Sequence, residues 1–274
     1  EDPGNPTYST RTIPKIVGGV NPESTAAAAA LYALAVERVV PVANARVAEA
    51  AKLLENTYRS VNIALVNELK ITFERMGIDV WEVIEAAKTK PFGFTAFYPG
   101  PGLGGHCIPI DPFYLSWKAA EYGVQARFVE LAGEMNRAMP RWVVSKVAEG
   151  LNEAEKSVKG SKIVVLGLSY KADIDDDRES PSYEVLDLLR EMGADIAYCD
   201  PHFPEMPQKR AYDLRLRSVP CNAETLAGFD AVVLCTAHRE FKDPALYAGV
   251  RLLVDTRHAV AAASPRGPVR LVRA

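Results

Sequence analysis

A long periodic pattern over residues 45–76 most strongly constrains how this chain can fold. Apolar side chains recur there at three- and four-residue steps, and Gly77 ends the run. A helix of that length usually spans a whole domain or an interface, so we expect a helical domain built on it and a two-fold homodimer that uses it. Lys52 and Asn56 lie four residues apart on one face of this helix, where a solvated row of surface charges is the commoner arrangement.

Shorter patterns extend the helical region on both sides of this helix. Asn21 provides a cap and Pro22 a first-turn residue, so a helix should begin there and run through the alanine-rich block to about Val39. Further helical patterns cover residues 79–88, 111–122 and 129–151. We therefore expect an all-helical central domain over residues 21–151, preceded by a linker over residues 1–20.

A glycine- and proline-rich stretch interrupts this region between Pro99 and Leu115. Four glycines and two prolines precede Cys107, so the backbone must turn repeatedly and can approach a bound ligand closely. Asp111, followed by Pro112, should cap the next helix. A cysteine without such a context is usually a small buried hydrophobic residue, but here we predict a reactive thiol between a ligand-binding loop and a helix start.

Beyond a polar linker at residues 152–160, the pattern changes to alternating strands and helices. Strands are expected at residues 162–166, 195–199, 231–235 and 251–255, and helices at residues 181–192 and 223–226. Apolar strands separated by helices predict a doubly wound parallel sheet over residues 161–274. Such a sheet binds ligands beyond the carboxyl ends of its strands.

The turn after the first of these strands, residues 167–171, lacks the GxGxxG fingerprint of a dinucleotide-binding fold. Its backbone amides, with Ser169 and Lys171, still suit a phosphate. Arg178 follows in an acidic segment, where it is a natural partner either for a phosphate or for the neighbouring carboxylates. The charge pattern does not separate these two readings.

Composition excludes several classes of partner. The net charge of −3, with both signs interspersed, provides no basic field for nucleic acid or an anionic membrane, and no apolar run is long enough to span a bilayer. The four cysteines are widely spaced, which argues against a zinc site and a dense disulfide framework and favours a cytoplasmic protein. Because the four histidines lack metal-ligand spacing, we expect them to have capping and packing roles and expect no metal site.

Three motifs together resemble the UDP-glucose/GDP-mannose dehydrogenase family, whose members oxidise nucleotide sugars at C6. They are the helix segment 48–59, the Gly-Gly-His-Cys-Ile-Pro-Ile-Asp-Pro run at residues 104–112, and the Gly-Leu-Ser-Tyr-Lys turn at residues 167–171 with the Asp-Asp-Arg-Glu-Ser-Pro run at residues 176–181. The His-Cys-Ile-Pro form is similar to the branch that acts on UDP-N-acetylglucosamine or UDP-N-acetylmannosamine. The resemblance implies a role in polysaccharide biosynthesis.

The resemblance also implies a role for individual residues. Cys107 would attack a sugar aldehyde to give a thiohemiacetal and then a thioester, Lys52 and Asn56 would hold the oxyanion and a water, and Asp111 would help to activate that water. The UDP-sugar would contact Tyr98, Pro99, Gly100, Pro101, Gly102, Leu103, Gly104, Tyr170, Lys171 and Arg257. Arg178 and Cys107 would contact NAD.

Members of this family begin with a Rossmann domain that binds NAD, and neither its glycine fingerprint nor the catalytic Ser-Pro-Glu-Arg motif occurs here. We therefore expect a chain that holds the central and C-terminal portions of such an enzyme, folds, and does not turn over alone. A non-catalytic nucleotide-sugar-binding or dimerising module is the alternative, and UDP-glucose is the alternative substrate.

Overall fold

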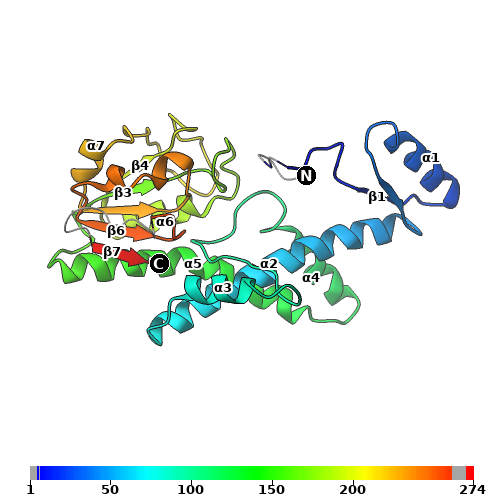
Figure 1. Ribbon diagram of the computed structural model, residues 1–274, viewed down its shortest axis with the longest axis horizontal. Helices are drawn as coiled ribbons and strands as arrows, with labels where there is room; N and C mark the ends of the chain where they lie inside the picture. The colour runs from blue at the N-terminus through cyan, green and yellow to red at the C-terminus, as the bar shows by residue number, and fades with distance from the viewer. Residues whose placement is uncertain (1–4, 6, 261–269) are drawn as a thin grey trace. The chain divides into compact units, whose positions relative to one another are not determined.

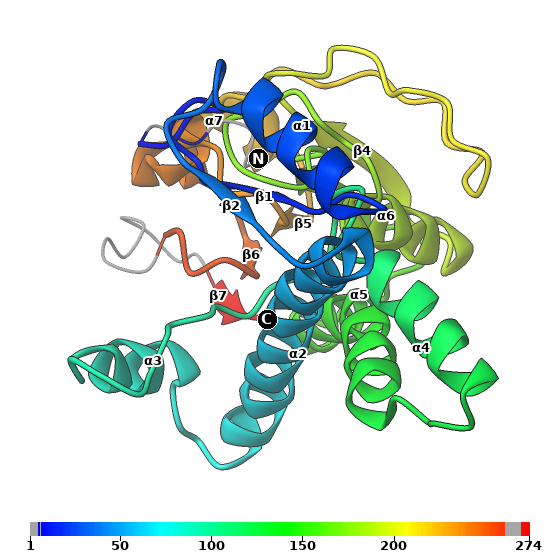
Figure 2. The same ribbon diagram turned by 90° about the vertical axis from the view of Figure 1, so that its right-hand side faces the viewer.

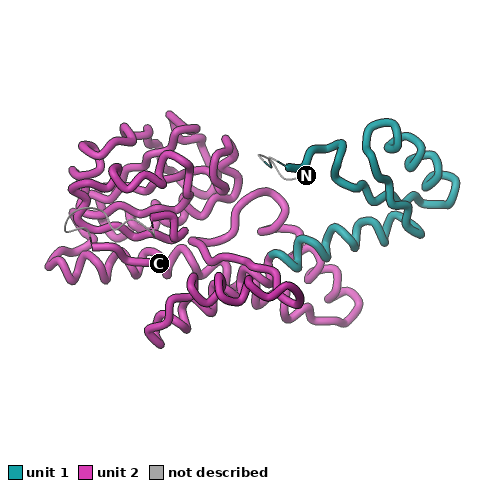
Figure 3. The backbone as a smooth tube through the Cα atoms, viewed as in Figure 1, with its two compact units in different colours: residues 1–59 teal, residues 60–274 magenta. Residues whose placement is uncertain are grey.

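The computed structural model describes residues 5, 7–260 and 270–274, and it divides the chain into two units, residues 1–59 and 60–274 (Figure 3). Part of the predicted N-terminal linker, residues 1–4 and 6, lies outside the described residues. The segment expected to be a linker, residues 152–160, belongs to the second unit. Each unit is described by itself below.

The first unit is a small βαβ element followed by the start of a long helix (Figure 2). Strand β1 (Lys15–Val17) pairs in parallel with β2 (Val39–Pro41), and helix α1 (Pro22–Tyr32) connects them. Asn21 caps α1 by accepting a hydrogen bond from the backbone N–H of Ser24, as predicted. The expected extension of this helix to Val39 is wrong, because the valine-rich segment after the alanine block pairs as a strand with β1.

The long helix α2 (Ala45–Arg75) confirms the periodic pattern. Asn44 precedes it and accepts the backbone N–H of Val47. Gly77, with a φ of 72°, ends the run in a conformation that suits glycine. The first turns of α2 belong to the first unit and the later turns to the second.

Three more helices complete the helical part of the second unit: α3 (Val80–Lys88), α4 (Asp111–Glu121) and α5 (Arg127–Glu153). The predicted spans agree with these to within two residues. Asp111 does not cap α4, contrary to prediction: Ile110 occupies the cap position without a side-chain hydrogen bond, and Asp111 begins the first turn. None of the described helices combines the length and apolar character that crossing a membrane requires.

A five-stranded parallel sheet forms the rest of the second unit, which confirms the predicted fold class. Its strand order is β4-β3-β5-β6-β7, and its strands are β3 (Lys162–Leu166), β4 (Asp195–Cys199), β5 (Ala231–Leu234), β6 (Leu252–Asp255) and β7 (Arg270–Arg273). Helices α6 (Pro181–Glu191) and α7 (Ala223–Ala227) and two short 3-10 helices, Arg239–Lys242 and Pro244–Tyr247, lie in the connections. Strand β7, a short edge strand with charged ends, was not predicted from the sequence.

The two faces of this sheet are buried in two separate apolar clusters. Alternate residues of the strands point to opposite faces, so Ile163 and Val165 join one cluster and Val164 and Leu166 the other. Helices α5 and α6 cover the first face, and α5 runs along the sheet (Figure 1). Burial on both faces explains why the strands are continuous apolar runs rather than alternating ones.

Candidate functional site

The glycine-rich loop before Cys107 packs directly on the turn that follows β3. A Cβ atom added to Gly104 would lie 2.4 Å from the Cβ atom of Tyr170, and one added to Gly102 would lie 3.0 Å from Pro181. Gly105 has a φ of 87° and donates its N–H to the carbonyl oxygen of Arg178 over 2.8 Å. These glycines therefore allow two segments of the protein to approach each other, which fixes the loop beside Tyr170 and Arg178.

Cys107 is a free, half-buried thiol at the end of this loop. Its carbonyl oxygen accepts the N–H groups of Ile110 and Asp111, at 3.2 and 2.8 Å, so the residue lies in a tight turn that leads into α4. Hydrogen bonding and charge from Asp176 raise the pKa of the Arg178 guanidinium, and Cys107 adds a smaller electrostatic contribution.

Arg178 pairs with a neighbouring acid in this structure. Its Nε atom donates to Oδ1 of Asp176 over 2.9 Å and its Nη2 atom to Oδ2 over 2.6 Å, a bidentate pair. The guanidinium is exposed. The sequence left open whether Arg178 pairs with a phosphate or with neighbouring carboxylates. In the structure its partner is the carboxylate of Asp176.

The turn after β3 does not offer its amides to a phosphate, contrary to expectation. Oδ2 of Asp200 accepts the N–H groups of Leu168 and Ser169, at 2.6 and 3.1 Å. The hydroxyl of Ser169 donates to the carbonyl oxygen of Ile174 over 2.7 Å. The protein's own carboxylate therefore occupies the anion-binding position that the sequence suggested for a ligand.

Asp200 is a buried residue at the carboxyl end of β4 to which the sequence alone assigned no role. Burial raises the pKa of its carboxyl, but hydrogen bonds from His238, His202 and Leu168 outweigh burial and hold it below its usual range. The Nε2 atom of His238 lies 3.2 Å from Oδ2 of Asp200. We conclude that Asp200 is an ionised acceptor that ties together the carboxyl ends of three strands.

His238 has the packing role that was expected of the histidines. Within the described part of the chain, Asp173, His202 and His238 bring ligand atoms within 4.8 Å of one another, the spacing of a metal site. However, the Nδ1 atom of His238 accepts the N–H of Asp173 over 2.9 Å, and its other nitrogen faces Asp200. Both ring nitrogens are therefore engaged by the protein.

Arg257 brings several of the predicted substrate residues to one cavity. Its Nε atom donates to the carbonyl oxygen of Cys235 over 2.8 Å, and a Cβ atom added to Gly100 would lie 2.4 Å from its Nη1 atom. Burial lowers the pKa of this guanidinium. Arg257, Tyr98 and Pro99 line a cavity of about 630 Å³.

A second cavity, of about 540 Å³, lies beside the other end of the loop. Gly102 and Leu103 line it together with Ile108, Pro109 and the start of α6. Of the remaining predicted residues, Pro101 is buried, and Tyr170 and Lys171 are half-buried in the turn after β3. The predicted loop and turn residues of the second unit therefore lie on two segments that pack against each other, the loop before Cys107 and the turn after β3.

Lys52 and Asn56 belong to the first unit and are described within it. Lys52 is exposed, whereas Asn56 is fully buried. The Nη2 atom of Arg59 donates to Oδ1 of Asn56. Lys52 is therefore a surface residue, as expected for a solvated row of charges, whereas Asn56 is not.

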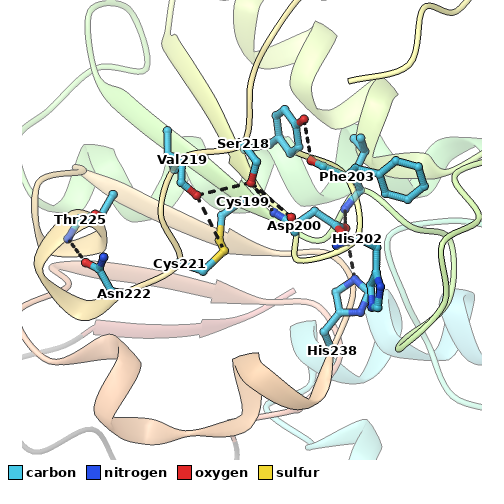
Figure 4. Close-up of a disulfide and its surroundings, with 12 residues drawn as sticks. Cys199, Asp200, His202, Phe203, Ser218, Val219, Cys221, Asn222, Thr225 and His238 are labelled. Carbon is cyan, nitrogen blue, oxygen red and sulfur yellow. Dashed lines mark hydrogen bonds and ion pairs between the residues drawn. A yellow bond between two sulfur atoms is a disulfide. The ribbon is translucent and has the colours of Figure 1, made fainter. Parts of the chain in front are cut away.

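A disulfide joins Cys199 to Cys221, with the two Cα atoms 5.8 Å apart (Figure 4). We expected both to be ordinary buried thiols, but Cys221 is exposed and both are paired. Sequence spacing could not identify the pair, because a disulfide depends on which residues meet in space. The cysteine pattern therefore no longer supports a reducing compartment.

Comparison with known proteins agrees with this arrangement. The model of the central domain of the UDP-glucose/GDP-mannose dehydrogenase family matches residues 46–138, and the model of the UDP binding domain of that family matches residues 164–262. UDP-N-acetyl-D-mannosamine dehydrogenase of Methanococcus maripaludis (strain C7) is 36% identical over 229 residues, covering 84% of this chain and 50% of the relative. The enzyme of that name from Escherichia coli K12 is 36% identical over 233 residues, covering 83% and 54%.

Solved structures show the same likeness. UDP-D-ManNAc dehydrogenase from Pyrococcus horikoshii superposes with a TM-score of 0.81 at 28% identity, over 96% of this chain and 60% of that one. The UDP-N-acetyl-mannosamine dehydrogenase Cap5O from Staphylococcus aureus gives a TM-score of 0.76 at 30% identity, over 96% and 59%. This chain spans about half the length of the curated relatives it matches. The chain belongs to the UDP-glucose/GDP-mannose dehydrogenase family, of which it carries the central domain and the UDP binding domain.

Proposed function

We propose that this chain is the substrate-binding and thiol-bearing portion of an NAD-dependent UDP-N-acetylhexosamine 6-dehydrogenase. The observation that carries the proposal is the packing of the Cys107 loop on Tyr170 and Arg178. It holds a half-exposed free thiol beside residues suited to a sugar nucleotide. The domain division that we propose follows function: a largely helical domain over residues 21–151, in which Val39–Pro41 is a strand and not part of a helix as expected, and a UDP-sugar domain over residues 161–274.

The reaction assigns a covalent role to Cys107. The thiolate adds to the C6 aldehyde of the sugar and forms a C–S bond, which gives a thiohemiacetal. Loss of a hydride from C6 and of the proton from the adjoining hydroxyl group turns this into a thioester. Water then adds to the thioester and the C–S bond breaks, which releases the carboxylate and the thiolate. In the proposed assignment Lys52 and Asn56 stabilise the oxyanion and Asp111 accepts a proton from the water.

NAD would accept the hydride in both oxidations, each of which removes two electrons from C6. The residues present fit one side of such a cofactor, because Arg178 is an exposed guanidinium whose backbone is bonded to the Cys107 loop. Arg178 would hold a phosphate there, at the expense of its pair with Asp176. Cys107 would face the reacting end.

A homodimer through α2 is part of the proposal. Four exposed apolar residues, Val47, Leu54, Tyr58 and Leu65, recur at steps of seven and four, so they form one stripe along the helix. Leu54→Lys and Leu65→Lys should therefore shift the mass measured by light scattering from dimer to monomer. Leu131→Lys replaces an exposed leucine of α5 and is the matched control.

Calorimetry and thiol protection test the substrate class. We expect UDP and the UDP-N-acetylhexosamines to bind, and the sugar nucleotides to slow alkylation of Cys107 by iodoacetamide, whereas UDP alone leaves the thiol more exposed. UDP-glucose should protect more weakly. Binding without protection would favour the second candidate, a nucleotide-sugar-binding module, and no detectable binding of any nucleotide would contradict both.

A further inference from the structure

Two buried asparagines connect the loop before Cys107 to the helices α2 and α5. Oδ1 of Asn67, on α2, accepts the backbone N–H of Gly100 over 3.0 Å, and Nδ2 of the same side chain donates to Oδ1 of Asn136 over 2.9 Å. Nδ2 of Asn136, on α5, donates in turn to the carbonyl oxygen of Ser60 over 3.1 Å. Both side chains are buried, so these bonds are shielded from water. We call this chain of hydrogen bonds the Asn67–Asn136 relay.

The two ends of the relay fix the direction of every bond in it. The N–H of Gly100 can only donate, so Asn67 must turn its oxygen toward the loop. The carbonyl oxygen of Ser60 can only accept, so Asn136 must turn its nitrogen toward α2. The remaining oxygen of Asn136 then faces the remaining nitrogen of Asn67. A buried network that is bonded at every step in this way is rigid, and it requires both asparagines.

Gly100 is the point at which the loop meets a residue that the resemblance assigns to the substrate. A Cβ atom added to Gly100 would lie 2.4 Å from Nη1 of Arg257, so the loop backbone passes directly against this guanidinium. Tyr98 and Pro99, which precede Gly100 and carry the same assignment, line one cavity together with Arg257. A displacement of Gly100 would therefore change the position of these loop residues relative to Arg257.

We propose that Asn67, supported by Asn136, is a positioning residue for the sugar-nucleotide loop, an inference that rests on the proposed function. Asn67 has no contact with the substrate in this assignment. It holds the N–H of Gly100 and so keeps residues 98–104 in one position against Arg257. The loop is then ordered before the sugar nucleotide binds, and binding loses less conformational entropy.

Hydrogen exchange of the ligand-free chain tests whether Asn67 holds the loop. In the unaltered chain the Gly100 amide, resolved by NMR spectroscopy, should exchange at least about a hundredfold more slowly than in an unfolded peptide. Asn67→Ala removes its acceptor, so exchange at Gly100 should become about tenfold faster, the effect of one hydrogen bond. Leu151→Ala is the matched control: it creates a cavity where α5 packs on the sheet and leaves the relay intact, so exchange at Gly100 should stay within about twofold.

Calorimetric titration with UDP-N-acetylhexosamines tests whether the relay matters for the ligand. Asn67→Ala should weaken binding about tenfold, whereas Leu151→Ala should change it by less than about twofold. Asn136→Ala should also weaken binding. The double variant of Asn67→Ala and Asn136→Ala should bind no more weakly than Asn67→Ala alone, because Asn136 acts on the loop through Asn67. A role in stability alone would produce neither the difference from the control nor this non-additivity.

Fast exchange at Gly100 in the unaltered chain would show that Asn67 does not hold the loop, and this measurement remains decisive if Asn67→Ala fails to fold. Equal losses of affinity in Asn67→Ala and Leu151→Ala would overturn the inference and leave the proposed function standing. Additive losses in the double variant would overturn the supporting role of Asn136. An unaltered chain that binds no nucleotide would overturn the proposed function, and this inference with it.

Discussion

Replacement of Cys107 by serine should remove all fast thiol chemistry from the native protein. All four cysteines lie among the described residues: Cys199 and Cys221 are joined, and Cys107 and Cys235 are free. Cys235 is fully buried at the end of β5. Cys107 is therefore the accessible thiol.

The environment of Cys235 determines how much more slowly its thiol should react than an ordinary accessible thiol. Burial raises the pKa of its thiol to about 12. At pH 8 a thiol with an ordinary pKa of about 8.5 is roughly one quarter thiolate, whereas one with a pKa of about 12 is roughly one part in ten thousand thiolate. The reactive form is therefore about 2,000-fold scarcer at Cys235 than at an ordinary thiol, before the lack of access slows it further.

Thiol titration with an aromatic disulfide reagent checks this reasoning. The native chain should react rapidly at one thiol, the denatured chain at two, and the reduced and denatured chain at four, in line with the free and paired cysteines. Cys107→Ser should give none, one and three. A native Cys107→Ser protein that still reacts rapidly would show that Cys235 or the disulfide pair is accessible, and an unreactive native chain would show that Cys107 is not.

Three further changes test the packing around the site. Asp200→Ala leaves two buried backbone N–H groups and an imidazole without their acceptor, so it should lower the free energy of unfolding in urea by about 3–5 kcal/mol; a loss under 1 kcal/mol would contradict the assigned network. Gly104→Ala forces a Cβ atom against Tyr170, so it should lower stability by about 1–3 kcal/mol and weaken UDP binding. Reduction of the Cys199–Cys221 disulfide, which closes a loop with a sequence separation of 22, should lower the free energy of unfolding by about 3 kcal/mol; Cys221→Ser should be insensitive to reductant.

The elements that could be predicted from sequence are those whose patterns are local. The run that became α2 has its own apolar period and its own glycine stop, and the strands β3 and β4 are apolar runs of the observed length. Val39–Pro41 and Arg270–Arg273 were missed because each is short and is a strand only through its partner, β1 or β6. Pairing between distant segments leaves little trace in either sequence.

The residues of the candidate site also differ in whether a local sequence pattern identifies them. Cys107 and its glycines carry a local signature, so the loop and its thiol could be located before the fold was known. Asp200, Asn67 and Asn136 could not, because their significance depends on atoms that come from other segments of the chain. The available signal for Asp200 was its position directly after the apolar strand β4. The sequence was instead interpreted as placing the anion-binding position in the turn after β3.

The carboxylate of Asp200 also bears on how the UDP binding domain holds a ligand. In a dinucleotide-binding turn the backbone amides after the first strand are free to bind a pyrophosphate. Here Asp200 takes two of those amides and adds a fixed negative charge, which disfavours a second anion at that point. Under the proposed function, a diphosphate on this domain would be held by side-chain cations, and Arg257, which lines the neighbouring cavity, is the candidate that the resemblance implies. The absence of GxGxxG from residues 167–171 is therefore consistent with a nucleotide-binding domain that uses an arginine and the loop before Cys107 in place of a glycine-rich turn.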